Sequence, residues 1–274
     1  MKTNAFDTRR FWQTLKWTVL TEKKSILTAF AAFLVAFLAI QLFSCFTIFD
    51  ISHGLGPGAT FAGMMVCNVI MGVMMLYYAS GILGNARTSQ QRVTALMLPA
   101  SNVEKFLARL VYCCILMPVL IFAAAYAATG LRVLLEMIAG HDDITKGFSL
   151  ILGGGMEEMA KTLVFSTFFD ISQTCFNFSI FVLGGVFFHQ RPFVWTTVTV
   201  VAGSILLSTL LYYIGVMIGE DNLQDFFHHF KGMTFETFDL IMSIVFTALT
   251  ILNIWLSYWL YRRLQVVQHK WFNV

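Results

Sequence analysis

The sequence predicts an all-α, polytopic membrane protein with six transmembrane helices, and three observations support this fold class. Of the 274 residues, 58% are hydrophobic and only 12% are charged, whereas a soluble domain carries about 25% charged residues. Six apolar stretches approach or exceed the roughly 20 residues that a helix needs to cross a bilayer. No segment alternates polar and apolar residues as a barrel strand does, so helices are expected to satisfy the backbone hydrogen bonds in lipid.

The chain before the first span is expected to form an amphipathic helix at the membrane interface, over residues 9–25. Phe11, Trp12, Leu15 and Val19 recur there at helical spacing among basic and polar residues, which is typical of a helix lying in the inner leaflet. A frayed basic tail is the alternative, because the apolar stripe is imperfect. The same segment lacks an apolar core followed by a small-residue cleavage site, so no signal peptide is expected.

The six predicted spans belong to a single transmembrane domain, 1–274. In chain order they are 26–47, 60–84, 108–130, 164–188, 193–217 and 240–261. Pro118 lies inside the third span and is expected to bend it, because proline removes a backbone donor and clashes with the preceding turn. All five cysteines fall within apolar stretches, and we expect the adjacent Cys113 and Cys114 to pack as apolar side chains rather than to form a redox pair.

The distribution of basic residues predicts that both termini are cytoplasmic. With the N-terminus inside, the cytoplasmic segments carry 14 of the 18 Lys and Arg residues. The opposite side carries four, which are Arg132, Lys146, Lys161 and Lys231. This excess is the positive-inside signal, so we expect a multi-pass protein of the plasma (inner) membrane.

The polar segment 87–109, between the second and third spans, is the best clue to function. Pro99 ends whatever precedes it, and Ser101 to Glu104 matches a capping box. A helix is therefore expected to begin near Asn102 on the cytoplasmic side and to continue into the third span. Short capped helices at a membrane surface suit the transmission of force, and an ordinary well-capped loop is the alternative.

This segment also resembles a known family. The stretches Thr-Ser-Gln-Gln-Arg (88–92) and Leu-Pro-Ala-Ser-Asn-Val-Glu-Lys-Phe-Leu-Ala-Arg (98–109) resemble the loop of ABC-2-type transporter permeases, closest to small six-helix permeases with an LPASxxEKF stretch. The resemblance implies the permease subunit of an ATP-binding-cassette exporter, whose loop is a coupling helix seated in a cytoplasmic ATPase subunit. The ATPase-coupling residues it implies are Gln90, Gln91, Arg92, Pro99, Ser101, Asn102, Glu104, Lys105 and Phe106.

The resemblance also implies which partners this chain would bind and which it would not. A second permease copy or a related permease would complete a twelve-helix pathway, membrane lipid would surround it, and no nucleic acid is expected to bind. No cofactor and no catalytic residue is expected in this chain, because ATP would be bound by the ATPase subunit. Residues 155–162 nearly match a phosphate-binding loop, but Ala160 replaces its second glycine and two glutamates would repel phosphate.

Two rival functions differ in class. A non-transporting scaffold or sensor would use the same segment as an adaptor. An intramembrane protease would use the paired glutamates Glu157 and Glu158 with His189, since a buried acid and histidine are needed to activate water. The sequence departs from the CPBP-type protease pattern, with Lys161 where that family has arginine and Gly185 where it has phenylalanine.

A polar group within the fourth span is a candidate intramembrane site, formed by Asp170, Gln173 and Asn177. Charged residues in a bilayer usually face protein or water and mark a pathway. The alternative is that Asp170 lies at the outer boundary of the span. No metal site is expected, because Asp225 with His228 or His229 supplies too few ligands.

Overall fold

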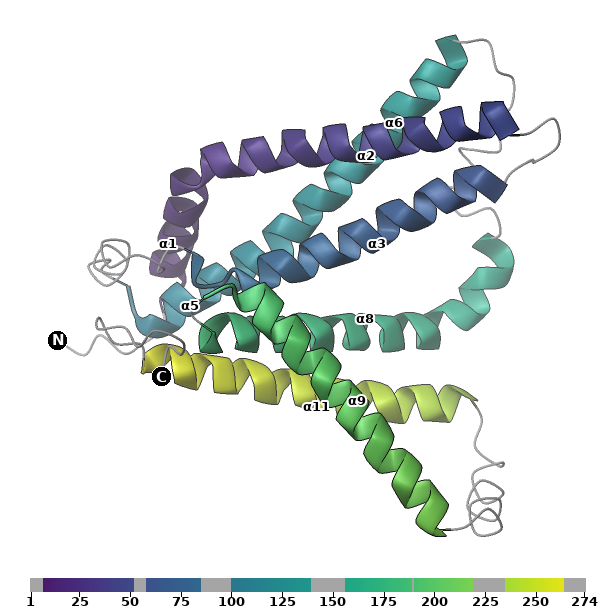
Figure 1. Cartoon of the computed structure of the whole chain (residues 1–274). Coiled ribbons are helices and arrows are strands. Elements are labelled where there is room, and N and C mark those ends of the chain that lie inside the picture. The colour runs from purple at the N-terminus through teal and green to yellow at the C-terminus, as the bar shows by residue number, and fades with distance from the viewer. Residues whose placement is uncertain are drawn as a thin grey trace. The chain divides into compact units, whose positions relative to one another are not determined.

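The chain is helical throughout the part that the computed structural model describes, which comprises residues 7–51, 58–84, 100–138, 156–188, 190–218 and 235–263. Figure 1 shows that most of these residues lie in long helices, and no strand occurs among them. The predicted all-α class is therefore confirmed for the described residues. The helices fall into two compact units, and each unit is described by itself.

Every predicted span coincides with helix, although the boundaries differ by a few residues. The helices are α1 Thr8–Thr21, α2 Lys23–Ile51, α3 Gly58–Ser80, α5 Asn102–Val111, the π-helix η2 Tyr112–Leu116, α6 Met117–Ile138, α8 Met156–Phe187, α9 Pro192–Ile218 and α11 Phe235–Arg262. The third predicted span is built from α5, η2 and α6 in succession. The predicted interfacial helix is α1, which is shorter than the range 9–25.

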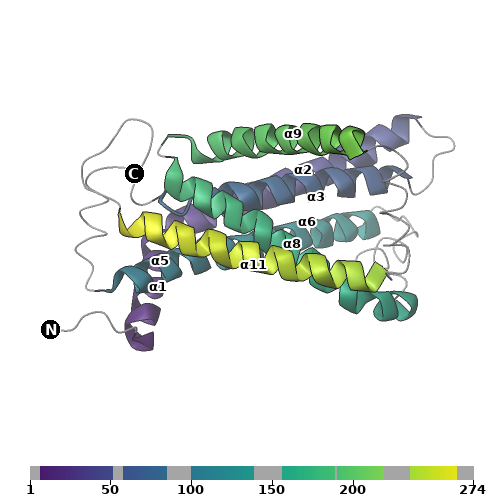
Figure 2. The same ribbon diagram turned by 90° about the horizontal axis from the view of Figure 1, so that it is seen from below.

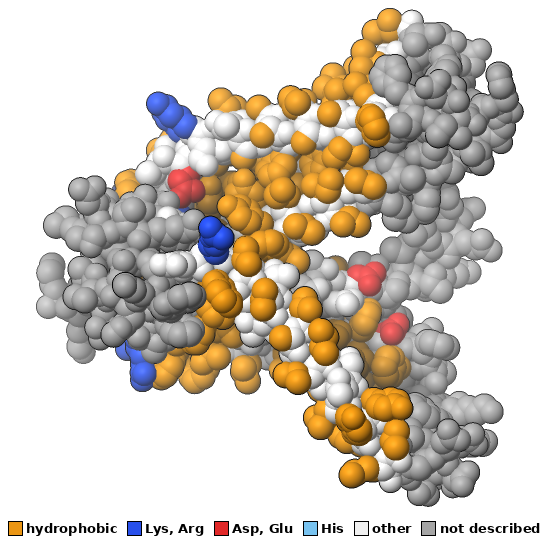
Figure 3. Space-filling model, in the orientation of Figure 1, with side chains coloured by type: hydrophobic (Ala, Val, Ile, Leu, Met, Phe, Trp, Pro, Cys, Tyr) orange, Lys and Arg blue, Asp and Glu red, His pale blue; other side chains and the backbone are white. Residues whose placement is uncertain are grey.

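Several helices have the length and composition of membrane spans. Within the described residues, four stretches are long and apolar enough to cross a bilayer: Lys23–Phe43, Asn102–Arg132, Pro192–Ile214 and Thr237–Arg262. Large apolar side chains are exposed along them, such as Leu206 at 71% and Trp255 at 64%. Figure 3 shows apolar side chains over most of the helix surface in view. Such an apolar surface favours lipid as the surrounding solvent. The total of six spans stays a prediction.

The first unit contains α1, α2, α3, α5, η2 and α6. Its most extensive helix pair is α2 with α6. Phe37 on α2 and Ile121 on α6 are fully buried, and the Gln41 side-chain amide of α2 donates to Thr129 Oγ1 of α6 at 3.0 Å. Interhelical hydrogen bonds of this kind hold helices together where lipid provides no hydrophobic driving force.

The sequence predicted a bend at Pro118, and the structure has a π-helical turn, η2, just before this residue. Proline cannot donate a hydrogen bond, and in an α-helix its ring clashes with the carbonyl four residues earlier, here that of Cys114. The turn before it widens, so that the N–H of Met117 donates to the carbonyl oxygen of Tyr112. Tyr112, Cys113 and Met117 are buried together at this turn. The sequence predicted the position of the irregularity but not its form.

The second unit contains α8, α9 and α11, together with Ser80 to Leu96. Figure 2 shows α11 lying along α8. The Asn253 side-chain amide of α11 donates to Ser179 Oγ of α8 at 3.1 Å, and the rings of Phe176 and Phe246 stack 5.3 Å apart. Close helix contact elsewhere on α8 requires glycine, because a Cβ on Gly185 would collide with the carbonyl group of Ser80.

Candidate functional site

The predicted capping box at the start of α5 is present. Ser101 has extended backbone, its hydroxyl accepts a hydrogen bond from the Glu104 N–H at 3.3 Å, and Glu104 Oε2 accepts one from the Ser101 N–H at 2.9 Å. The reciprocal bonds satisfy two donors that a helix start otherwise leaves without partners. Helix α5 therefore begins at Asn102, as the sequence predicts.

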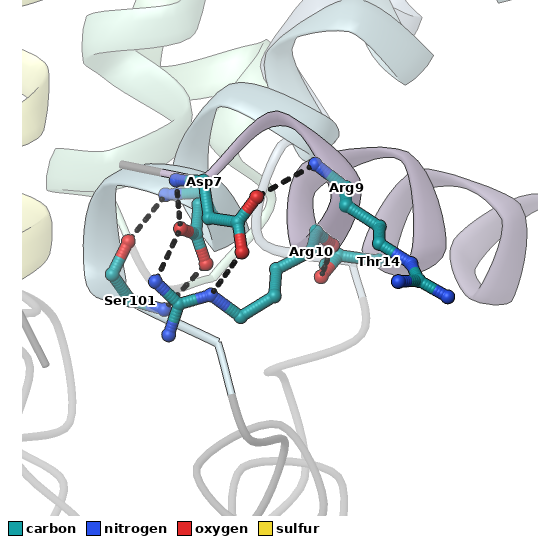
Figure 4. Close-up of polar contacts among 6 residues, drawn as sticks. Asp7, Arg9, Arg10, Thr14 and Ser101 are labelled. Atoms are coloured by element: carbon teal, nitrogen blue, oxygen red, sulfur yellow. Dashed lines mark hydrogen bonds and ion pairs between the residues drawn. The ribbon is translucent and has the colours of Figure 1, made fainter. Parts of the chain in front are cut away.

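Glu104 also connects α5 to the N-terminal helix. Its second oxygen, Oε1, accepts a hydrogen bond from the Asp7 N–H at 3.0 Å and lies 3.7 Å from an Nη atom of Arg10. Asp7 is itself the N-cap of α1, because its carboxylate accepts from the Arg9 N–H. Figure 4 shows Asp7, Arg10 and Ser101 turned towards one another at this point. The starts of α1 and α5 thus meet at one carboxylate.

The environment of Glu104 compensates its charge. The side chain is completely buried, and a buried carboxylate is tolerated only where hydrogen bonds and an opposite charge replace water. Two backbone N–H groups and the Arg10 guanidinium provide these contacts. Both N–H groups belong to helix starts, which carry partial positive charge. The local structure therefore favours an ionised carboxylate at this position.

A second polar contact joins the other ends of the two helices. Arg109, in the last turn of α5, donates to Glu22 Oε1 at 2.9 Å, and both side chains are largely buried. Glu22 is the C-cap of α1, and it also forms a side-chain hydrogen bond with Tyr112 of η2. We call Asp7, Arg10, Glu22, Glu104 and Arg109 together the α1–α5 junction.

Apolar and small side chains fill the space between these two contacts. On α1, Thr14, Leu15 and Thr18 are buried, and on α5 Ala108 is buried. Both threonine hydroxyls donate to backbone carbonyls of their own helix, so neither requires a polar partner on α5. The two helices therefore pack along their length, with charged contacts at both ends.

The structure divides the predicted ATPase-coupling residues into three groups. Glu104, Lys105 and Phe106 are buried within the chain. Asn102 is exposed, as is its neighbour Val103 at 42%, while Ser101 is partly exposed. The remaining predicted coupling residues lie outside the described residues, and they are Gln90, Gln91, Arg92 and Pro99. A partner can therefore reach α5 directly at Asn102 and Val103, whereas Glu104 positions the helix.

The predicted intramembrane polar residues lie on one helix. Asp170, Gln173 and Asn177 belong to α8 and are all exposed. Their spacing of three and four residues places them on one side of it. Buried Ser172 and Ser179 lie on the same helix and donate to backbone carbonyls within it. An intramembrane polar site formed by these three exposed residues stays a prediction.

The structure describes only some of the residues on which the phosphate-binding, protease and metal-site alternatives depend. Residues 156–162, at the end of the near-match to a phosphate-binding loop, are helical and open α8. The side chains of Glu157, Glu158 and Lys161 lie outside the described residues, as does His189. Asp225, His228 and His229 lie outside them too.

A group of buried polar side chains in the first unit was not predicted. Gln41 of α2, Cys67 of α3 and Arg132 of α6 are each less than 10% exposed. The Gln41 side chain forms a hydrogen bond with the Cys67 thiol, and the Arg132 guanidinium lies near the same thiol. These contacts connect three helices. The predicted spans place Arg132 in an external segment, and only the packing of α6 shows that its side chain is buried.

The capping residues of α1 were also missed, although the sequence holds a signal for one of them. Asp7 precedes a helical stretch, which is the ordinary N-cap position.

Comparison of the chain with protein-family models, curated proteins and solved structures finds no match. The expectation of an ABC-2-type permease accordingly depends on segment 87–109 and on the succession of apolar helices.

Proposed function

We propose that this chain is the transmembrane permease subunit of an ATP-binding-cassette exporter that a separate cytoplasmic ATPase drives. The observation that supports this most is the α1–α5 junction, which fixes a short capped helix at the entrance of a long apolar one. A helix used to receive force must be held rigidly by its own protein. Glu104 and Arg109 provide this hold at opposite ends of α5.

The continuity of the third span supports the same proposal. From Asn102 to Ile138 the chain is helical without a break through α5, η2 and α6. At 1.5 Å per residue this is about 55 Å, nearly twice the roughly 30 Å of a hydrocarbon core. Polar α5 therefore has room to extend beyond the lipid, where a cytoplasmic ATPase would reach it. Displacement of α5 would pass along one helix into α6 and from there into α2.

The complete assembly would contain further chains. A second copy of this chain, or a related permease, would complete the pathway, and two ATPase subunits would bind the ATP. Six spans with both termini cytoplasmic would place α5 on the side of the ATPases. The substrate would pass between helices, and the exposed polar side of α8 with Asp170, Gln173 and Asn177 is its candidate contact.

Co-purification with a candidate cytoplasmic ATPase tests the proposal. Val103 is the informative position, because its side chain is 42% exposed and a substitution leaves the buried contacts of Glu104 intact. We expect wild-type chain to retain the ATPase and Val103→Arg to lose most of it. ATP hydrolysis stimulated by the permease should fall in parallel.

Thr21→Arg is the matched control, because Thr21 is also exposed but lies at the far end of α1. It should retain the ATPase as the wild-type chain does. Equal ATPase retention by Val103→Arg and wild type would contradict docking at α5. Failure of the wild-type chain to bind any ATPase would favour the scaffold or sensor alternative instead.

A further inference from the structure

The exposed side of α1 combines basic and interfacial residues on one face. Arg9, Trp12, Lys16 and Leu20 are all exposed, with Trp12 at 62% and Leu20 at 54%. At 100° per residue these four positions fall within an arc of about 80°. We call this set the basic face of α1. It lies opposite the buried Thr14, Leu15 and Thr18.

This arrangement differs from the interfacial helix that the sequence predicts. An interfacial helix ordinarily buries its apolar side in lipid, but here Leu15 of the predicted apolar stripe is buried within the chain, where α1 packs against α5, while Trp12 is exposed. Figure 4 shows the Arg9 side chain directed away from Asp7, Arg10 and Ser101. The side of α1 that remains for a binding partner is therefore the basic one.

The neighbouring helix places the basic face close to the membrane. After the cap at Glu22, α2 begins at Lys23 and opens the first candidate span, Lys23–Phe43. Lys23 and Lys24 are exposed at this connection. Because α1 is joined to the span without a linker, its basic face cannot lie far from the lipid headgroups.

We propose that the basic face of α1 binds the headgroups of anionic phospholipids. Charge complementarity favours this partner, since Arg9, Lys16, Lys23 and Lys24 offer four positive charges and the face itself contains no acidic residue. Each basic residue near such a surface strengthens association by about fivefold. Trp12 and Leu20 suit the headgroup level, where tryptophan is enriched and apolar side chains are partly buried. The proposal does not depend on the transporter function.

Fluorescence quenching of the full-length chain in lipid vesicles tests this binding. Vesicles of phosphatidylcholine and phosphatidylglycerol are prepared with bromine on the acyl chains of one lipid at a time. The difference between wild type and Trp12→Phe isolates the emission of Trp12 from that of the other tryptophans. We expect bromine on phosphatidylglycerol to quench this emission about twofold more strongly than bromine on phosphatidylcholine, and high salt to abolish the preference.

Charge-matched variants identify the residues responsible. Arg9→Gln with Lys16→Gln should remove the preference for phosphatidylglycerol, because both side chains are exposed and their loss leaves the α1–α5 junction intact. Lys146→Gln with Lys231→Gln removes the same charge elsewhere in the sequence and should keep the preference. Equal quenching by the two brominated lipids in wild type would overturn the proposal. So would a preference that survives in Arg9→Gln with Lys16→Gln, or Trp12 emission that responds only to added ATPase protein.

Discussion

Glu104 is the residue on which the candidate site depends. One carboxylate closes the capping box of α5 through Ser101 and holds the start of α1 through Asp7 and Arg10. Segment 87–109 predicted the first contact, because a capping box requires only local spacing. It did not predict the second, since Asp7 and Glu104 are 97 positions apart.

Glu104→Gln is expected to destabilise the protein by about 2–3 kcal/mol, because a buried charged hydrogen-bonding group loses its charge while its donors remain. An amide also has one oxygen instead of two, so one of the two backbone N–H groups would face an NH₂ group. The apparent melting temperature in detergent should fall by several degrees. Asn102→Ala, at an exposed position beside it, should change stability by less than about 0.5 kcal/mol. Equal melting of Glu104→Gln and wild type would show that the carboxylate contacts are dispensable.

At the scale of secondary-structure elements, the helices differ in how tightly they pack. α8 carries Gly184 and Gly185, whose added Cβ atoms would collide with Thr196 of α9 and with the backbone of Ser80. Gly203 of α9 has open space around it. Sequence periodicity predicted helix at both places but could not distinguish the glycine that a close contact requires from the one that it does not.

Gly185→Ala is expected to cost about 1–3 kcal/mol, because the obstacle is backbone, which cannot move aside as a side chain does. Gly203→Ala should be neutral or stabilising by up to about 1 kcal/mol, since alanine favours helix more than glycine does. Thermal unfolding of both variants in the same detergent provides the comparison. A Gly185→Ala protein as stable as Gly203→Ala would contradict the close approach of α8 to Ser80.

At the scale of the whole molecule, function depends on which side of the membrane α5 faces. The positive-inside distribution predicts that α5 is cytoplasmic. Helix lengths agree with multiple spans, since four candidate spans occur among the described residues. Neither helix length nor packing determines orientation, because a bundle crosses a bilayer equally well either way round.

Cysteine labelling decides the orientation. A membrane-impermeant maleimide should not label Val103→Cys in intact cells and should label it after the membrane is opened. Lys146→Cys, predicted on the opposite side, should react in intact cells, and the wild-type chain measures the background from its own cysteines. Labelling of Val103→Cys in intact cells would place α5 away from any cytoplasmic ATPase and remove the basis of the proposed function.

The sequence by itself determined the helical class, the approximate positions of the helices and the N-cap of α5 at Ser101. These follow from local composition and spacing, because apolar length sets a span and a capping box involves four neighbouring residues. It also located the irregularity at Pro118, which arises from the chemistry of one residue.

Only the tertiary structure decided which faces of these helices are covered. The burial of Glu104 depends on the start of α1, where Asp7 and Arg10 contact it, and that of Arg132 on packing around α6. Amphipathic spacing shows that a helix has two sides, but the identity of the neighbour on each side comes from contacts distant in sequence. For this reason a residue expected to face a partner holds the chain together, and the basic face of α1 is left exposed.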